Sequence, residues 1–160
     1  MEELIMSQFE KQNSKVGDIL MMRNLNNGIL RTLNPKQQDE AINAINSLID
    51  RQFVTYEKGN LECLRLTELG FKSLYKNSKT TSDIEKLILD AFEKQNSRAN
   101  HILMIKNLNH TIFQNLNPIE KQLIEDAVNN LENKGFVKYE DASSGPECLR
   151  LTELGYENLY

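Results

Sequence analysis

Cysteine and histidine carry the most reactive side chains in this sequence, and their spacing decides whether they can act together. The chain holds two cysteines, Cys63 and Cys148, and two histidines, His101 and His110. Neither cysteine has a histidine in a local catalytic pattern, and no further ligand joins the histidines at metal-binding spacing. Because the cysteines occupy equivalent places in two copies of one repeat, we expect reduced, packed thiols. The pattern predicts neither a nucleophile nor a metal site.

Sequence motifs for other kinds of chemistry are also missing. The chain has no glycine-rich phosphate loop, no His-Glu-x-x-His pattern and no Gly-x-Ser-x-Gly pattern. No apolar run approaches the ~18 residues that span a bilayer. The start, Met1 to Ile5, lacks the basic and apolar regions of a secretory signal. The sequence therefore predicts a cytoplasmic protein that is not an enzyme, holds no cofactor and contacts no membrane.

An internal repeat dominates the chain. Residues 9–14 return unchanged as residues 92–97, and the run from Cys63 to Gly70 returns from Cys148 to Gly155. The 160 residues thus contain two copies of one small domain, each near the lower size limit for independent folding. We predict domains at 1–76 and 83–160 with approximate two-fold symmetry. The polar stretch 77–82 is the predicted linker, and Asp83 is predicted to cap the helix that follows it.

The same order of helices is predicted in both copies. Apolar residues at helical spacing predict a first helix that ends near residues 12–14 and, in the second copy, 95–97. Residues 18–22 and 101–105 form either a short strand or the packed start of a second helix. Asn26 and Asn109 are predicted to cap a brief helix. A third helix is predicted to begin at Asn34-Pro35 and Asn117-Pro118. Its predicted buried stripe comprises Ala41, Ile42, Ala44, Ile45, Leu48 and Ile49 in the first copy, and Leu123, Ile124, Ala127, Val128 and Leu131 in the second.

Each copy is predicted to close with a hairpin and a short helix. Alternating apolar residues at 53–56 and 63–66, and at 136–139 and 148–151, predict two antiparallel strands. Gly135 is predicted to end the preceding helix in the second copy, and Thr67 and Thr152 to cap the closing helices. The predicted fold class is α+β, mainly α, with three helices, a hairpin and a closing helix in each copy.

This order of elements resembles the winged helix-turn-helix family over nearly the whole chain. The most specific part is an apolar helix followed by a hairpin and then by Leu-Thr-Glu-Leu-Gly, at residues 66–70 and 151–155. The resemblance implies that the third helix enters the DNA major groove while the hairpin tip touches the backbone or minor groove. The DNA-contacting residues that it implies are Lys36, Gln37, Gln38, Asn43, Lys58, Asn60, Lys121, Gln122 and Asn129. Gln and Asn can bond adenine, and Lys can reach guanine or phosphate.

Charge separates the two copies and leaves the function open. Residues 1–77 carry ten basic and ten acidic side chains, whereas residues 83–160 carry eight and thirteen. Carboxylates repel phosphate, so the first copy is the predicted DNA reader of a transcription-regulatory protein. The alternative is a scaffold whose paired domains grip a protein partner and bind no DNA. A small-molecule sensor between the copies is a third option, for which the sequence shows no dedicated polar cluster.

Aromatic residues at matching positions are predicted to pack in the core instead of forming a stacking surface for single strands. They are Phe53, Tyr56, Phe71, Tyr75, Phe136, Tyr139, Tyr156 and Tyr160. An exposed Tyr75 or Tyr160 at the end of a closing helix would indicate an interface, and a homodimer through these helices is the further oligomeric prediction.

Overall fold

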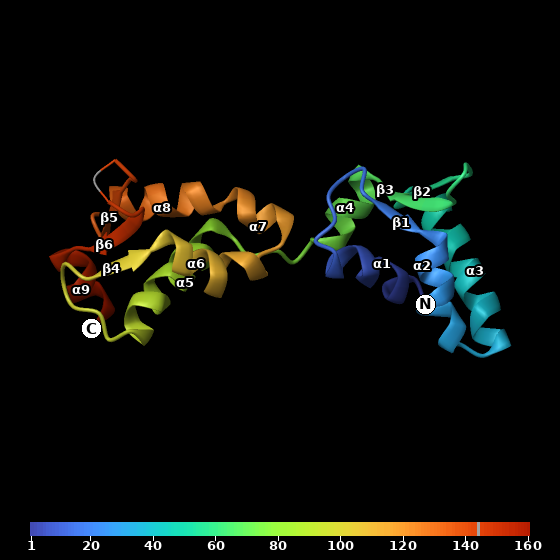
Figure 1. The fold of residues 1–160 in the computed structure, drawn as a ribbon, viewed down its shortest axis with the longest axis horizontal. Coiled ribbons are helices and arrows are strands. Elements are labelled where there is room, and N and C mark those ends of the chain that lie inside the picture. The colour runs from blue at the N-terminus through green and yellow to red at the C-terminus, as the bar shows by residue number, and fades with distance from the viewer. Residues whose placement is uncertain (144) are drawn as a thin grey trace. The chain divides into compact units, whose positions relative to one another are not determined.

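Each half of the chain folds as a unit of its own, and the order of elements is the same in both except that the third helix is divided in two in the second half (Figure 1). The computed structural model describes residues 1–143 and 145–160. Unit 1, Met1–Asn77, contains α1 (Glu2–Lys11), β1 (Ile19–Met21), α2 (Met22–Asn27), η1 (Leu30–Thr32), α3 (Pro35–Asp50), β2 (Val54–Glu57), β3 (Cys63–Leu66) and α4 (Glu68–Leu74). Unit 2, Ser78–Tyr160, contains α5 (Thr81–Lys94), β4 (Ile102–Met104), α6 (Ile105–Thr111), η2 (Phe113–Asn115), α7 (Pro118–Gln122), α8 (Ile124–Asn133), β5 (Val137–Glu140), β6 (Cys148–Leu151) and α9 (Glu153–Leu159). The fold is mainly helical α+β and is consistent with two tandem winged-helix units.

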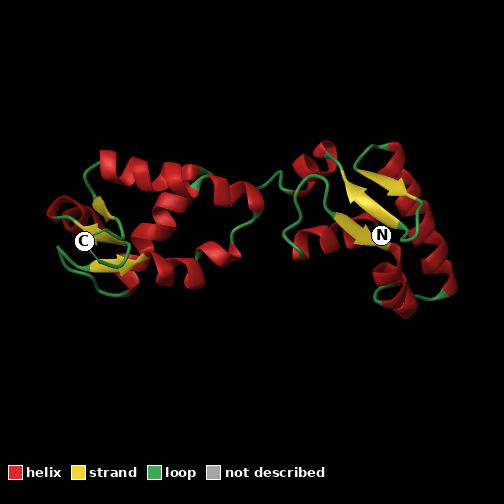
Figure 2. Ribbon diagram, turned by 45° about the horizontal axis from the view of Figure 1, so that its top comes forward, coloured by secondary structure: helices red, strands yellow, loops and turns green. Residues whose placement is uncertain are grey.

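The sheet of each unit has three antiparallel strands, one more than the predicted hairpin. The strand orders are β1-β3-β2 and β4-β6-β5, so β3 and β6 are central (Figure 2). Leu64 is paired with Leu20 on one side and with Tyr56 on the other. The short apolar run at residues 18–22 therefore forms both structures that the sequence left open, a strand that leads directly into a helix.

The predicted caps at Asn26 and Asn109 are wrong. Both residues lie inside helices, because α2 and α6 begin as soon as β1 and β4 end. The first backbone N–H of α2, on Met22, donates to the carbonyl oxygen of Glu62 at 2.9 Å. In unit 2 Ile105 donates likewise to Glu147 at 3.0 Å. The sheet thus satisfies a donor that a side-chain cap would otherwise serve.

The third helix of each unit starts where the Asn-Pro pairs predict. Asn34 and Asn117 each accept a backbone N–H of the first turn through the side chain. In the opposite direction, the side chains of Gln37 and Glu120 accept the backbone N–H of the cap residue. This reciprocal capping box satisfies two donors that the helix itself cannot. In unit 2 the helix is interrupted at Leu123, whose N–H bonds three residues back to Glu120. Gly135, with φ +72°, ends α8 as predicted.

The Leu-Thr-Glu-Leu-Gly run joins the closing helix to the sheet. Thr67 Oγ1 accepts the Gly70 N–H at 3.0 Å and lies 3.0 Å from the carbonyl oxygen of Phe53, to which it can donate. A Cβ on Gly70 would lie 2.0 Å from that same carbonyl oxygen, and one on Gly155 would lie 2.0 Å from that of Phe136. Only glycine allows so close an approach of helix and backbone.

The first helix of unit 2 begins earlier than predicted, inside the stretch 77–82. Thr80 is the cap of α5, and Asp83 instead occupies the third helical position, from which its carboxylate accepts the Thr80 N–H at 2.8 Å. Thr and Asp both serve as caps, and here the earlier residue takes that role because Asp83 can complete the capping box.

The buried stripe of α3 is narrower than predicted. Ala41, Ala44, Ile45 and Leu48 are buried, but Ile42 is 56% exposed. Positions 41, 44, 45 and 48 share one helical face, and residue 42 is rotated away from it.

The aromatic residues only partly follow the core prediction. Tyr75 is buried and its hydroxyl donates to the Ser14 carbonyl at 3.1 Å, while Phe53, Phe71 and Phe136 pack against the cores of their units. The prediction is wrong for Tyr56, Tyr139, Tyr156 and Tyr160, which are exposed. Tyr56 and Tyr139 pair with the buried Leu64 and Leu149 but lie on β2 and β5, the edge strands of their sheets, so strand alternation alone could not bury them.

Candidate functional site

One surface of unit 1 is formed by α2, η1, α3 and the β2–β3 turn. One hollow lies between α2 and this turn and is lined by Arg23, Asn24, Asn60 and neighbouring residues. A second lies between α2, η1 and α3 and is lined by Arg31, Gln38, Ile42 and others. Met22, Asn26 and Asn27 border both hollows. The two hollows therefore adjoin, and we call them together the unit 1 surface.

Four cations lie on the elements of the unit 1 surface. They are Arg23 of α2, Arg31 of η1, Lys36 of α3 and Lys58 of the β2–β3 turn, and all four are exposed. Within residues 1–143 and 145–160 none of them forms an ion pair, whereas Arg51, Arg65 and Lys72 of the same unit do. Unpaired, solvated cations are available to an anionic ligand.

The predicted contact residues at the start of α3 differ in availability. Gln37 is engaged in the capping box, and its Oε1 accepts the Asn34 N–H at 3.1 Å. Gln38 donates to the carbonyl oxygens of Leu30 and Leu33, at 3.2 and 3.1 Å, and so ties η1 to the helix. Lys36 and Asn43 are exposed, and their side chains form no such local bond within the part of the chain that the structure describes. If Gln37 and Gln38 contacted DNA bases, these hydrogen bonds within unit 1 would have to break.

The base of the predicted wing is held together by an internal ion pair. Arg65 Nε lies 2.5 Å from a Glu57 carboxylate oxygen and Arg65 Nη1 donates to the carbonyl of Gly17. The hydrogen bond from Arg65 holds the pKa of Glu57 below its usual value. Arg150 and Glu140 repeat the pair in unit 2. These arginines fix the hairpins, which leaves Lys58 and Asn60 as the predicted wing contacts.

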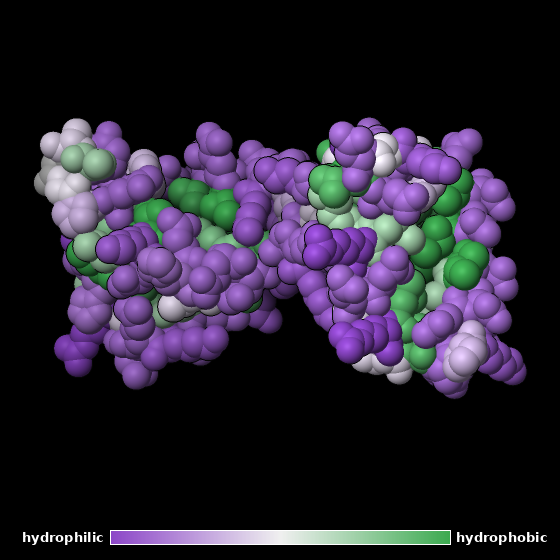
Figure 3. Space-filling model, turned by 45° about the vertical axis from the view of Figure 1, so that its right-hand side comes forward, coloured by the Kyte–Doolittle hydropathy of each residue, from purple (hydrophilic) through white to green (hydrophobic). Residues whose placement is uncertain are grey.

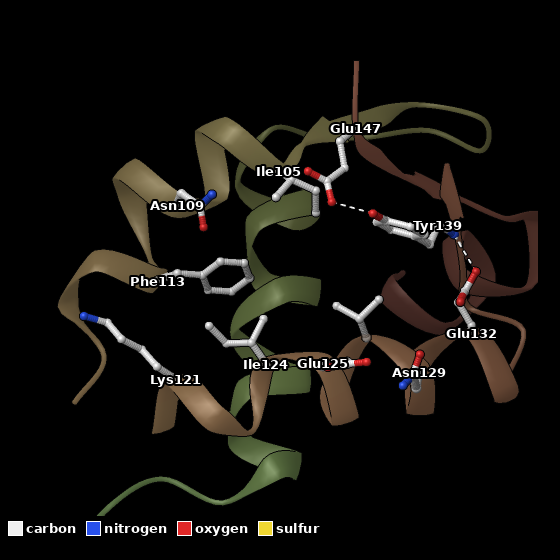
Figure 4. Close-up of a pocket in the computed structure, with 11 residues that line it drawn as sticks. Ile105, Asn109, Phe113, Lys121, Ile124, Glu125, Asn129, Glu132, Tyr139 and Glu147 are labelled. Carbon is white, nitrogen blue, oxygen red and sulfur yellow. Dashed lines mark hydrogen bonds between the residues drawn. The ribbon is translucent and has the colours of Figure 1, made fainter. Parts of the chain in front are cut away.

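Unit 2 has a groove at the place that corresponds to the unit 1 surface. It encloses about 480 Å³ between α6, η2, α8 and the β5–β6 hairpin. Phe113 and Ile124 point toward each other across it, with Lys121 and Asn109 at one end and Tyr139, Glu132 and Glu147 at the other (Figure 4). We call this the unit 2 groove. Hydrophobic surface bordered by hydrophilic residues is visible on both units (Figure 3).

Carboxylates surround the apolar floor of the unit 2 groove. Tyr139 is held between two of them, because its N–H donates to Glu132 Oε1 at 2.6 Å and its hydroxyl to Glu147. Glu125 lines the same groove. In the described part of the chain no cation pairs with Glu125, Glu132 or Glu147. The electrostatic field of these carboxylates favours a cation and disfavours phosphate.

The predicted DNA contacts of unit 2 fall within or beside this acidic groove. Lys121 and Asn129 line it, and Gln122 is exposed at the end of α7. The geometry thus places Lys121 and Asn129 next to carboxylates on the face where a winged helix would read DNA.

Tyr139 should be difficult to ionise. The hydrogen bond to Glu147 raises the pKa of Tyr139 to about 12, and burial adds to the effect. We expect Glu147→Gln to bring this pKa back toward the ordinary value of 10.0, because the neutral amide no longer opposes the phenolate. NMR titration of ring-labelled tyrosine measures it, and an unchanged pKa would show that Glu147 is not the hydrogen-bond acceptor.

The two cysteines lie on the central strands β3 and β6. Both thiols are free and buried, and burial raises the pKa of Cys148. Among the described residues, no three side chains of His, Cys, Asp and Glu are gathered so that they could hold a metal. In the same part of the chain, every helix is too short or too polar to cross a bilayer.

Sequence reasoning missed Arg23 and Arg31 in unit 1 and Glu132 and Glu147 of the unit 2 groove. The run Met22-Arg23-Asn24-Leu25-Asn26-Asn27 was the available signal for Arg23, since it combines a cation with several amides. Glu132 and Glu147 come from separate elements and leave no local pattern. The chain matches no protein-family model, and no match was found among curated proteins or solved structures.

Proposed function

We propose that the protein is a DNA-binding regulator that contacts duplex DNA through the unit 1 surface. The observation that carries the proposal is the set of four unpaired cations, Arg23, Arg31, Lys36 and Lys58, on α2, η1, α3 and the β2–β3 turn. Cations on such elements position a winged helix on phosphates, and the amides of Asn24, Asn43 and Asn60 between them suit base edges.

Salt dependence tests this proposal most directly. We expect full-length protein to bind a mixed-sequence duplex in fluorescence anisotropy, with affinity that falls steeply from low to physiological salt. Two variants, Arg23→Gln with Arg31→Gln and Lys36→Gln with Lys58→Gln, should each weaken binding by about tenfold or more and reduce the salt slope by nearly two.

Lys11→Gln with Lys76→Gln is the matched control. It removes two exposed cations that lie on α1 and after α4, away from the unit 1 surface, and so changes net charge equally. If the control weakens binding as much as the two test variants, the attraction is a property of net charge and the proposed surface is wrong.

The competing proposal is a protein-interaction scaffold that binds no DNA. The acidic rim of the unit 2 groove favours it, because partners of that groove cannot be polyanions. Absence of duplex binding even at low salt, with the protein folded, would decide for the scaffold.

A further inference from the structure

The unit 2 groove has the form of a site for an apolar side chain. Phe113, Ile124 and Val128 provide its floor, and its volume of about 480 Å³ lies in the usual range of ligand pockets. Phe113 is itself part of the core of unit 2, so the floor is fixed by packing. An apolar group that enters the groove would displace water from a surface that already exists.

The rim of the groove differs from three carboxylates of unit 2 that have cation partners, and resembles exposed carboxylates such as Asp126 and Glu157, which have none in the described residues. Elsewhere in this unit, Glu85 is paired with Lys134, Glu120 with Lys79, and Glu140 with Arg150. The rim carboxylates Glu125, Glu132 and Glu147 have no cation in the described residues. Their uncompensated charge is complementary to a ligand that brings its own lysine or arginine.

Comparison of the two units shows where this charge arises. When Asn34 is aligned with Asn117, Glu125 and Glu132 stand where unit 1 has Ile42 and Ile49. Tyr139 and Glu147 instead have matching residues, Tyr56 and Glu62. The unit 1 hollows thus hold Arg23, Arg31 and one carboxylate, Glu62, whereas the unit 2 groove holds three carboxylates and one lysine. The unit 2 groove is therefore the more acidic of the two surfaces.

We propose that the unit 2 groove binds a short amphipathic helix of a partner protein, one that inserts an aliphatic or aromatic side chain and carries lysine or arginine beside it. The apolar side chain lies on Phe113, Ile124 and Val128, in the manner of a helix in a groove. The basic residue lies against Glu125 and Glu132. Lys121, at the other end of the groove, faces the carbonyl end of the bound helix, where negative partial charge gathers. This binding is independent of DNA contact by unit 1.

Three synthetic peptides test the proposal on the full chain. The first combines leucine and phenylalanine at helical spacing with lysine and arginine. The second replaces the basic residues by glutamate, and the third replaces the apolar residues by serine. We expect only the first to shift the backbone NMR signals of Phe113, Glu125 and Tyr139. Glu125→Gln with Glu132→Gln should weaken it roughly three- to tenfold, as expected for partly exposed ion pairs.

The controls separate site-specific binding from attraction by net charge. Asp126→Asn with Glu157→Gln removes two exposed carboxylates outside the groove and should leave the affinity unchanged. Glu125→Gln alone, at a side chain that forms no hydrogen bond in the described structure, covers the case in which the double variant unfolds. The proposal is wrong if the glutamate peptide binds equally well, or if the groove variants match the control. It is also wrong if arginine amide alone reproduces the shifts, because the groove would then take small cations.

Discussion

A Gly70→Ala variant is expected to lose about 3 kcal/mol or more of the free energy of unfolding of unit 1, because overpacking against backbone cannot relax easily. The new Cβ would lie 2.0 Å from the carbonyl oxygen of Phe53 and 2.9 Å from Leu66 Cδ1. Either α4 or the start of β2 must shift. The same shift would disturb Thr67, whose hydroxyl caps α4 and lies within hydrogen-bond reach of that carbonyl. A domain of this size has only a few kcal/mol to lose.

Urea unfolding, monitored by hydrogen exchange of unit 1 amides, measures this loss of unfolding free energy. Gly59→Ala is the control in the same unit, since a Cβ there meets nothing within 4 Å and φ is not positive. Gly155→Ala should have the same effect in unit 2, where the obstacle is the carbonyl of Phe136. Equal stability of the Gly70 and Gly59 variants would disprove the close approach of α4 to β2.

Glu120→Ala is expected to destabilise unit 2 by about 2–3 kcal/mol, because it leaves two partly buried backbone donors without their acceptor. The Glu120 carboxylate is nearly buried and accepts the backbone N–H groups of Lys79 and Asn117, at 2.8 and 3.0 Å. It also pairs with the Lys79 ammonium at 3.3 Å. One side chain thus completes the cap of α7 and holds the segment that enters α5.

Unit 1 provides the matched control for this loss. Gln37 occupies the equivalent position and serves the capping box alone, so Gln37→Ala should cost only about 1 kcal/mol. Glu120→Gln should fall between the two, because an amide can keep the cap but not the charge. Denaturant unfolding of the three variants gives the comparison, and a Glu120→Ala loss no greater than that of Gln37→Ala would contradict it.

The same carboxylate makes unit 2 sensitive to acid. Burial by itself raises the pKa of Glu120, but the hydrogen bonds from Lys79 and Asn117 outweigh it and the pKa is lowered. Because the pKa of Glu120 is lower in the folded state, its ionised form stabilises unit 2. This stabilisation is fully present above the pKa of the unfolded chain, about 4.3, and is lost as the pH falls through the pKa of the folded state. The pKa of Glu85 is lowered in the same way by Lys134 and Asn130, against the effect of burial. Glu120→Gln should therefore reduce the acid-induced loss of stability in unit 2.

Some helix ends could be predicted from the local sequence pattern, and others could not. The Asn-Pro caps, the threonine caps and the Gly135 helix end follow from residue type, because the bonds that they make are local in sequence. The misplaced caps at Asn26, Asn109 and Asp83 have the opposite cause. In each case another donor or acceptor, from the sheet or from an earlier threonine, took the role.

The residues of the candidate sites also divide into those that the sequence identifies and those whose contacts depend on the tertiary structure. The exposed cations Lys36 and Lys58 were identifiable from their place in the repeat, since solvation of a charged side chain is the default. The local bonds of Gln37 and Gln38, and the ion pairs of Arg65 and Arg150, were not, because their partners depend on how helix, turn and strand approach one another.

By itself the sequence determined that one small α+β domain occurs twice, since residues 63–70 and 148–155 repeat a strand, a cap and an obligatory glycine. Only the tertiary structure decided what the two copies present to solvent. Glu125, Glu132 and Glu147 become one acidic rim because α8, which carries the first two, lies beside the residue that precedes β6, around Phe113. Periodicity records which face of an element is apolar, whereas the charge of a groove depends on which faces meet.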